Sequence, residues 1–210
     1  MTAPYLVELQ EKIRELDLLQ RDKSFKTPNR QSRIFLALAY RVNEICWSSA
    51  NLIQQGRIAV GVSLMRIYWD YFVRALWFQH CATDEETEHF IQTDKIQRTS
   101  KNGNIYYVDH HTMCQEVDRI KPVPFELERV KRARYEVFNS FAHGGTDLLY
   151  RTMSDDNTIT DQFTDEEIKY CAEFAFVVAL MMAFAVADFA EHEEEMAQIG
   201  EMLQSFLPPE

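Results

Sequence analysis

Glycine, proline and cysteine are all scarce in this chain: its 210 residues include six glycines, six prolines and four cysteines. Glycine and proline mark most turns, so their scarcity favours a few long helices over a sheet of many short strands. The four cysteines are far apart and form no CxxC pair. This spacing excludes a small secreted domain that is held together by disulfides.

Segments that would assign a compartment or a common activity are also missing. The first residues carry no basic stretch followed by an apolar one, which is what a signal peptide requires. The longest apolar run, 174–187, has 14 residues, and a membrane span needs about 20. We therefore expect a cytoplasmic protein without membrane contact. The sequence also lacks a glycine-rich phosphate loop and the GxSxG and HExxH motifs.

The metal-binding residue types do not occur at convincing spacings. Glu86 and His89 have ExxH spacing, but a di-iron bundle needs a second such motif. His110, His111 and Cys114 lie close together without a fourth ligand nearby. We predict no metal site and no other cofactor.

Apolar periodicity predicts an all-α protein that forms one helical domain over residues 1–210. Apolar residues recur every three or four positions in the segments expected to be long helices, which are 4–19, 29–55, 57–82, 125–142 and 164–192. Shorter helices are predicted at 83–94, 109–120, 147–153 and 193–206. The expected architecture is an up-down bundle of four to five long helices with short extra helices, and no segment alternates between apolar and polar residues over a length that would require a sheet.

The net charge of −11 is unevenly distributed along the chain. Residues 154–210 contain 14 acidic side chains and one basic one, whereas residues 1–153 have a net charge of +2. The overall acidity argues against non-specific coating of nucleic acid or membrane, but it leaves room for a local basic site. The acidic end, including the predicted C-terminal helix or tail at 193–210, is either a solvated surface or a docking site for a protein partner.

A basic segment leads towards the second half of the chain. Residues 119–134 contain six basic side chains and two acidic ones. This segment is either a solvated helix face or a lane that guides an anionic substrate towards His143.

Two groups of polar residues have spacings that suit chemistry. Arg66, Asp70 and Arg74 are four residues apart, so they share one face of a helix that is otherwise aromatic. They form either a ladder of ion pairs between helices or a guanidinium site for phosphate or carboxylate. Asn139 and His143 are also one turn apart. His143 is either a helix-terminal packing residue or a catalytic group.

These two blocks carry a resemblance to known proteins. Arg66-x3-Asp70-x3-Arg74-x2-Trp77 and the later Asn-Ser-x2-His-Gly-Gly block at 139–145 resemble an uncharacterised family of bacterial helical proteins. More distantly, the arrangement is similar to the HEPN class of helical bundles. That class includes metal-independent RNases of toxin–antitoxin and phage-defence systems, which are often dimers with the active site at the dimer interface.

The resemblance implies a site around His143. The nuclease motif of the class is an Arg, a polar residue, three further residues and a His. Asn139 and His143 match its last two positions, and Phe138 occupies the position of the Arg. We infer that Arg134 or Arg74 replaces the missing arginine.

The resemblance and this inference together give each site residue a role. His143 would be the general acid or base, Arg66 and Arg74 would neutralise phosphate, Asn139 would orient it, and Asp70 would hold the arginines. The residues expected to contact substrate are Arg134, Trp77, Ser140 and Gly144.

Three functions therefore stay open from the sequence. The first is a HEPN-like RNase of bacterial defence or toxin–antitoxin type that acts on RNA as a homodimer. The second is a non-catalytic dimer or partner-binding module, which Phe138 and the acidic end favour. The third is a small-anion pocket between Arg66, Arg74 and His143.

Overall fold

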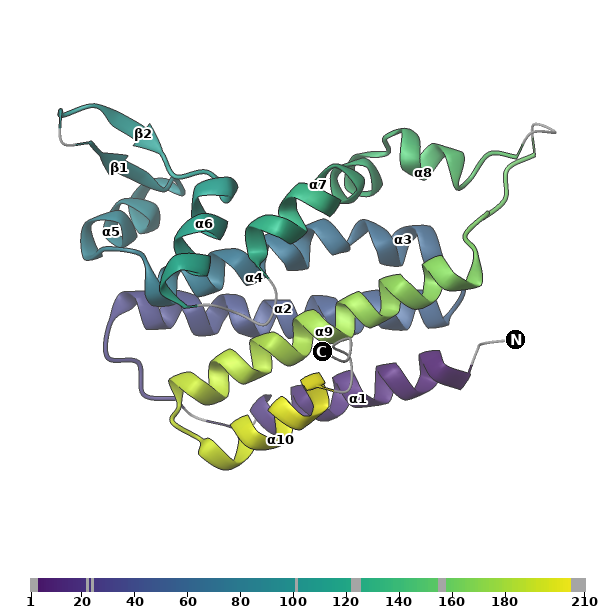
Figure 1. The fold of residues 1–210 in the computed structure, drawn as a ribbon, viewed down its shortest axis with the longest axis horizontal. Helices are drawn as coiled ribbons and strands as arrows, with labels where there is room; N and C mark the ends of the chain where they lie inside the picture. The colour runs from purple at the N-terminus through teal and green to yellow at the C-terminus, as the bar shows by residue number, and fades with distance from the viewer. Residues whose placement is uncertain are drawn as a thin grey trace.

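The computed structural model describes residues 4–21, 23, 25–100, 102–121, 126–154 and 158–204. Its long helices are α1 (Pro4–Arg21), α2 (Arg30–Gln54), α4 (Met65–His80), α7 (Leu127–His143) and α9 (Asp165–Phe189). Its shorter elements are α3 (Ile58–Ser63), α5 (Asp84–Thr93), β1 (Gln97–Thr99), β2 (Ile105–Tyr107), α6 (His110–Ile120), α8 (Thr146–Tyr150) and α10 (Glu193–Gln204). The described chain is therefore mostly helical, as predicted (Figure 1).

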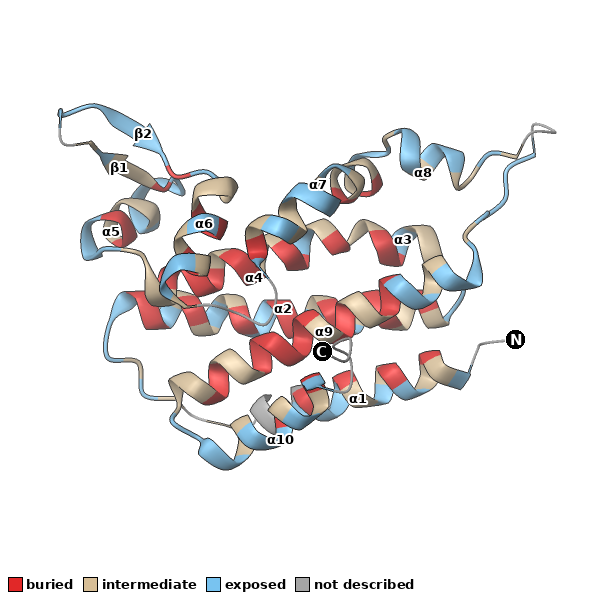
Figure 2. Cartoon of the chain, viewed as in Figure 1, coloured by how far each residue is buried: buried red, intermediate tan, exposed pale blue. Residues whose placement is uncertain are grey.

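Helices α2, α4 and α9 form the centre of the bundle. α2 packs against both α4 and α9, and α1 and α10 cover α9 from another side. α6 and α7 pack on α4, and α7 also contacts α3. Buried residues follow the facing sides of these helices, and they dominate the middle of α9 (Figure 2). The buried side chains from α1 to α10 form one continuous cluster.

α9 contains the long apolar run of the sequence. By length and composition alone this helix could cross a membrane, but 67% of its most apolar window is buried inside the fold. Its Phe174 ring packs against Tyr68, Trp69 and Phe138 with centroids 5.2 to 6.0 Å apart. Aromatic contacts of this kind, together with apolar burial, stabilise the packing of α4 and α7 on α9. The apolar run therefore belongs to α9, which is the core helix of this bundle.

The local signals at helix ends explain most of the observed boundaries. Asn29 accepts a hydrogen bond from the Ser32 backbone at the start of α2, and Thr83 and Thr164 form capping boxes at the starts of α5 and α9. Gly144, with φ of 68°, ends α7 in the left-handed conformation that glycine adopts readily.

One predicted helix, 57–82, is divided in two by Leu64. Gly61 of α3 approaches α2 so closely that a Cβ atom there would lie 2.6 Å from Ile53 Cγ1 and 2.9 Å from the Ser49 carbonyl oxygen. The Ser49 hydroxyl in turn donates a hydrogen bond of 2.8 Å to the Gly61 carbonyl. This contact with α2 fixes the direction of α3, and a new helix begins at Met65. The periodicity of the sequence does not reveal the break, because it continues across it.

A short hairpin is the other departure from the predicted fold. β1 and β2 pair antiparallel, with Gln97 opposite Tyr107, and Gly103 has φ of 80° in the turn between them. Strands of three residues are too short to show alternation of apolar and polar side chains. The sequence pattern therefore did not predict this hairpin.

The C-terminal helices are separate. α9 ends at Phe189, slightly before the predicted end near His192, and Glu191 has φ of 56° in the link to α10. α10 buries Ile199 and Leu203 against the bundle, so this acidic helix has an anchored apolar side. The rest of the predicted 193–210 segment lies outside the described residues.

Candidate functional site

Side chains from three helices meet where α4, α6 and α7 join. On α4, Arg66 Nε donates a hydrogen bond of 2.7 Å to Asp70 Oδ2. On α6, His110 Nε2 lies 3.2 Å from Asp70 Oδ1. On α7, the Tyr135 ring lies 4.0 Å from the Arg66 guanidinium carbon and stacks on His110 with centroids 4.9 Å apart. We call Arg66, Asp70, His110 and Tyr135 the α4–α6–α7 cluster.

Two polar atoms at the centre of this cluster are unsatisfied. Asp70 Oδ1 and His110 Nε2 are both buried, and neither has a partner with hydrogen-bond geometry among the described residues, although the Tyr135 hydroxyl lies close enough to Asp70 to lower the pKa of its carboxyl group. Most buried polar atoms in folded proteins are hydrogen-bonded, so two orphans facing each other are unusual. The side chains are still 23% and 16% exposed, respectively. Solvent therefore reaches the outer atoms of these side chains, whereas Asp70 Oδ1 and His110 Nε2 themselves are shielded from it.

The surroundings of the cluster are cationic. Lys131 Nζ lies 5.6 Å from the centre of the Tyr135 ring, and Arg74 is close enough to influence both Asp70 and His110 electrostatically. The ion pairs of the described residues include no carboxylate partner for Arg74 or Lys131. Arg66 and Arg74 thus act on Asp70, and with Lys131 they act on His110, so three cations lie near two carboxylates, Asp70 and Asp109. Such an excess of positive charge suits an anionic ligand.

Burial controls the protonation of the cluster. Burial raises the pKa of Asp70, and the opposing effect of its hydrogen bond to Arg66 only partly offsets this. Burial, followed by the charges of Arg66 and Lys131, lowers the pKa of His110 to about 3. Burial and the charge of Asp70 raise the pKa of Tyr135 to about 12. At neutral pH His110 is therefore an uncharged imidazole beside the Asp70 carboxylate and the neighbouring cations.

Replacing His110 with glutamine is expected to flatten the pH dependence of stability between about pH 7 and pH 5. In the folded protein His110 has a pKa of about 3, whereas an unfolded histidine titrates near about 6.5. The unfolded state therefore binds more protons in this window, and stability falls as the pH falls. This effect amounts to about 2 kcal/mol over the window. Urea unfolding at both pH values measures it.

Asp70 acts in the opposite sense, because its raised pKa lets the folded state bind a proton more readily. The comparison between the natural protein and the His110→Gln variant isolates the histidine. Equal losses of stability in the two proteins on acidification would show that His110 is not buried as the structure has it.

Cys114 supports His110 from the interior. Its sulfur lies 3.7 Å from His110 Nδ1, one turn further along α6. The thiol is fully buried, and burial raises its pKa to about 12. A thiol this hard to ionise is a poor nucleophile, so its role is to hold the imidazole ring in place. The described residues contain no group of three His, Cys, Asp or Glu side chains able to hold a metal ion.

The structure brings together only part of the site suggested by the sequence. Arg66 and Asp70 form the predicted ion pair. His143 is exposed at the end of α7, about 12 Å along the helix from Tyr135. Arg74 lies two turns from Arg66 on α4, on the side of His110. The sequence predicted that His143 lies near Arg66 and Arg74. Within one chain, these positions keep His143 apart from both arginines.

Phe138 occupies a core position. It is 1% exposed, and its ring lies 5.2 Å from that of Phe174 on α9. A side chain here points into the bundle, so the missing motif arginine leaves no vacant position at the surface. Asn139, the next residue, is half-buried, and its Oδ1 has no hydrogen-bond partner among the described residues.

Ser140 and Gly144, two predicted substrate contacts, build the turn between α7 and α8. The Ser140 hydroxyl accepts a hydrogen bond of 2.9 Å from the Asp147 backbone, and the Ser140 carbonyl accepts from the Gly144 backbone. A Cβ atom at Gly145 would lie 2.6 Å from the Ser140 hydroxyl oxygen. The double glycine thus lets the turn into α8 pack closely against Ser140. This packing within the chain explains the glycines of the 139–145 block, and no ligand is needed to explain them.

Trp77 and Arg134, the other two predicted contacts, lie away from the cluster. Trp77 is fully buried and donates a hydrogen bond of 2.8 Å from its indole nitrogen to Glu116. That burial does not fit a role in substrate binding. Arg134 is exposed, and its guanidinium carbon lies 5.0 Å from the centre of the Tyr170 ring on α9.

His110, Tyr135 and Lys131 are the members of the site that the sequence did not indicate as partners of Arg66. His110 directly follows Asp109, whose side chain caps α6 by accepting a hydrogen bond from the Thr112 backbone. That capping pattern places His110 at a helix start. Only the packing of α6 on α4 places its ring beside Asp70.

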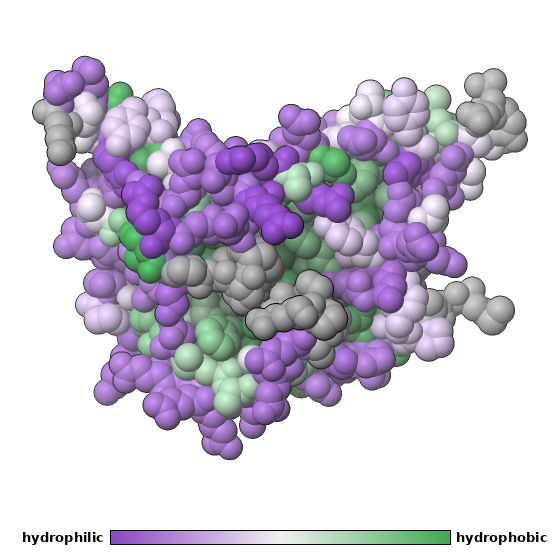
Figure 3. All heavy atoms as spheres, in the orientation of Figure 1, coloured by the Kyte–Doolittle hydropathy of each residue, from purple (hydrophilic) through white to green (hydrophobic). Residues whose placement is uncertain are grey.

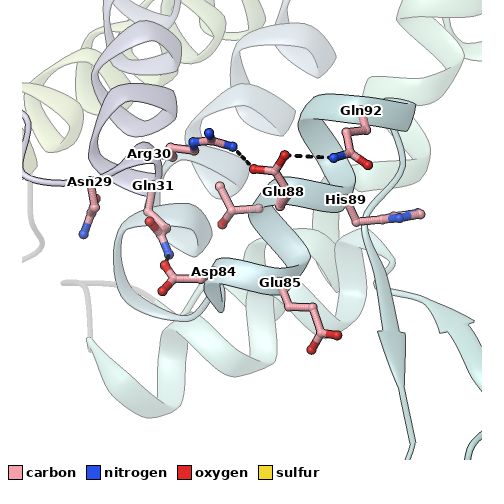
Figure 4. A pocket seen from close by; sticks show the side chains of 9 residues that line it. Asn29, Arg30, Gln31, Asp84, Glu85, Glu88, His89 and Gln92 are labelled. Carbon is pink, nitrogen blue, oxygen red and sulfur yellow. Dashed lines mark hydrogen bonds and ion pairs between the residues drawn. The ribbon is translucent and has the colours of Figure 1, made fainter.

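A second hollow, between the starts of α2 and α5, is a weaker candidate (Figure 4). It has a volume of about 680 Å³ and is lined by residues of polar and charged types. Arg30 pairs with Glu88, which also accepts a hydrogen bond of 2.8 Å from Gln92, while Gln31 donates one of 2.5 Å to Asp84. Most of its polar groups are thus already satisfied by one another.

The fold and the cluster define a helical-bundle protein with a half-buried cationic site. Residues 42–209 match the model of a family of unknown function, DUF6988, and the chain belongs to this family. No curated protein and no solved structure matches the chain. The matched range contains the whole α4–α6–α7 cluster and leaves out α1 and the start of α2.

Proposed function

We propose that this chain is a HEPN-like helical protein that binds RNA through phosphate groups at the α4–α6–α7 cluster and cleaves it there without a metal ion. The observation that carries the proposal is the facing pair of unsatisfied atoms, Asp70 Oδ1 and His110 Nε2, beneath a group of cations. A cytoplasmic role in toxin–antitoxin or phage-defence systems suits such an activity, with two copies of the chain forming a dimer.

The chemistry follows from the protonation of the cluster. In RNA cleavage the ribose 2′-oxygen forms a bond to phosphorus while the bond from phosphorus to the 5′-oxygen breaks. Neutral His110 would take the 2′-hydroxyl proton, and the carboxylate of Asp70 would stabilise the imidazolium that results. Arg66 and Arg74 would neutralise the phosphate. The proton delivered to the 5′-oxygen would come from water or from the protonated imidazole.

This assignment gives His110 the role that the sequence suggested for His143. Both are histidines near helix ends, but it is His110 that contacts Asp70 and Tyr135. The guanidinium carbon of Arg66 lies over the Tyr135 ring, and its Nε donates a hydrogen bond to Asp70. Its two terminal nitrogens accordingly suit bidentate binding of an anion.

A matched set of variants tests the proposal on single-stranded RNA in the presence of a chelator. His110→Gln is expected to slow cleavage by roughly a hundredfold or more while RNA binding persists. Arg74→Gln is expected to weaken binding and to reduce its dependence on salt. His143→Ala, the control, is expected to cleave as well as the natural protein. A loss of cleavage in His143→Ala but not in His110→Gln would overturn this assignment.

A second candidate function is a non-catalytic module that binds a protein partner. The burial of Phe138 favours it, because the position of the motif arginine belongs to the core. In this case the acidic α10 and the start of α9 would contact a basic partner. A natural protein that neither binds nor cleaves RNA would favour this protein-binding module over an RNase.

A further inference from the structure

A cavity lies between α7, α8 and the first turns of α9, away from the cluster. Its volume is about 490 Å³, within the usual range for sites that bind small molecules. Phe138, Phe141 and Phe163 line its apolar part, and Tyr170 lies at its edge. The rings of Phe141 and Phe163 are 6.2 Å apart and inclined by 58°. Hydrophobic residues are visible between α7 and α9 on an otherwise mostly hydrophilic face (Figure 3).

The charged groups around this cavity are unequally satisfied. Arg151 forms an ion pair with Glu167 across its rim. Arg134 lies over the Tyr170 ring, with its guanidinium carbon 5.0 Å from the centroid. Asp147 and Glu166 also line the cavity, and the ion pairs of the described residues include neither carboxylate. The charged groups of the lining that form no ion pair are therefore mainly negative.

We propose that this cavity binds a small organic amine with an aromatic body. The ammonium group would lie against Asp147 and Glu166, and the apolar body would enter between the phenylalanine rings. Aromatic faces attract cations, and Arg134 already occupies such a position on Tyr170. The proposal does not depend on the proposed cleavage of RNA.

Electrostatics favour a cation over an anion at this place. The cavity includes the start of α9, whose first turn carries Asp165, Glu166 and Glu167. The charged residues that line the cavity are three carboxylates, Asp147, Glu166 and Glu167, and two guanidinium groups, Arg134 and Arg151. A surface of this sign concentrates cations and repels carboxylates. Among the described residues that line the cavity, an anionic ligand would have only Arg134 to bind it, because Arg151 is already paired.

Three probes of almost the same shape test the charge preference. Calorimetry or ligand-observed NMR would compare 2-phenylethylamine, 3-phenylpropionate and 2-phenylethanol, with tryptamine as a larger amine. We expect saturable binding of at least one amine and binding of the propionate that is at least about tenfold weaker. Saturable binding of neither amine, or equal binding of the propionate, would overturn the proposal.

Variants at the rim locate the site. Asp147→Asn and Glu166→Gln are each expected to weaken amine binding by roughly fivefold. Phe163→Leu keeps an apolar side chain but removes the ring, and it is expected to weaken binding by a similar factor. Circular dichroism checks that each variant is folded.

Two further variants distinguish binding in this cavity from binding elsewhere on the protein. Arg134→Gln removes a cation from the rim, so amine binding is expected to stay equal or become tighter. A loss of binding in this variant would contradict a cation site. His110→Gln, in the α4–α6–α7 cluster, is expected to bind amines like the natural protein. A loss there would mean that the amine binds at the cluster instead.

Discussion

Replacing Phe138 with arginine is expected to destabilise the fold by at least about 5 kcal/mol, although this change completes the arginine–histidine motif in the sequence. Phe138 is 1% exposed and packs on Phe174. The substitution removes a large apolar side chain, which alone costs about 3–5 kcal/mol. It also places a charged side chain against the Phe174 ring, in a buried position that the bundle fills with apolar atoms. Because whole domains are stable by about 5–15 kcal/mol, much of the variant would be unfolded.

Denaturant unfolding, with Phe138→Leu as the control, measures this effect. Leucine keeps an apolar side chain and is expected to cost about 1–1.5 kcal/mol. If the arginine variant is as stable as the leucine variant, the new side chain must reach solvent or an anion. The motif position would then belong to a surface site, and the structural assignment of Phe138 to the core would be wrong.

Replacing Arg98 with alanine is the second change with a large expected effect, a loss of about 3–5 kcal/mol. Arg98 donates hydrogen bonds of 2.5 Å to both Glu86 and Glu116. Glu116 also accepts from the indole of Trp77, and Glu86 accepts from the Thr83 backbone in the capping box of α5. Removing Arg98 leaves two carboxylates, 5% and 16% exposed, without their cation.

This network connects α4, α5, β1 and α6, so its loss should loosen the hairpin end of the molecule. Burial alone would raise the pKa of Glu116, but its hydrogen bonds to Arg98 and Trp77 keep it below the ordinary value. The stabilisation is therefore complete above the ordinary pKa of a glutamate and declines as the pH falls. The cost of Arg98→Ala should accordingly shrink at acidic pH.

A double variant distinguishes this network from ordinary surface ion pairs. Adding Glu116→Gln to Arg98→Ala removes one of the unpaired charges and is expected to restore about 1–2 kcal/mol. Urea unfolding of the single and double variants gives the values. A loss below about 1 kcal/mol for Arg98→Ala would place the network among exposed pairs, which contribute little to stability.

The sequence pointed to two members of the cluster, Arg66 and Asp70. The spacing of Arg66 and Asp70 put both on one helix face, and the structure shows them as an ion pair. The sequence also offered an ion-pair ladder between helices as the alternative to a ligand site. The contacts of Asp70 with His110 and Tyr135 fit both possibilities, because they join three helices and still leave Asp70 Oδ1 unsatisfied among the described residues.

The sequence pointed to His143 because it lies in a distinctive short motif. The structure explains that motif by the turn that it forms. The Asn-Ser-x2-His-Gly-Gly block forms the end of α7 and the turn into α8, where Ser140 and the glycines make the hydrogen bonds. His110 carries no comparable pattern in its neighbourhood. Its significance depends on Arg66 and Tyr135, which are 44 and 25 residues away in the sequence.

The sequence by itself determined the helical class, the capping boxes at Thr83 and Thr164, the glycine that ends α7 and the identity of α9 as the core helix. These features depend on neighbouring residues or on one periodicity, so a single chain segment contains the information. The tertiary structure decided the break before Met65, the hairpin, the burial of Phe138 and the meeting of Arg66, Asp70, His110 and Tyr135. Each of these depends on which helix faces pack together and at what depth, and periodicity along one segment specifies neither.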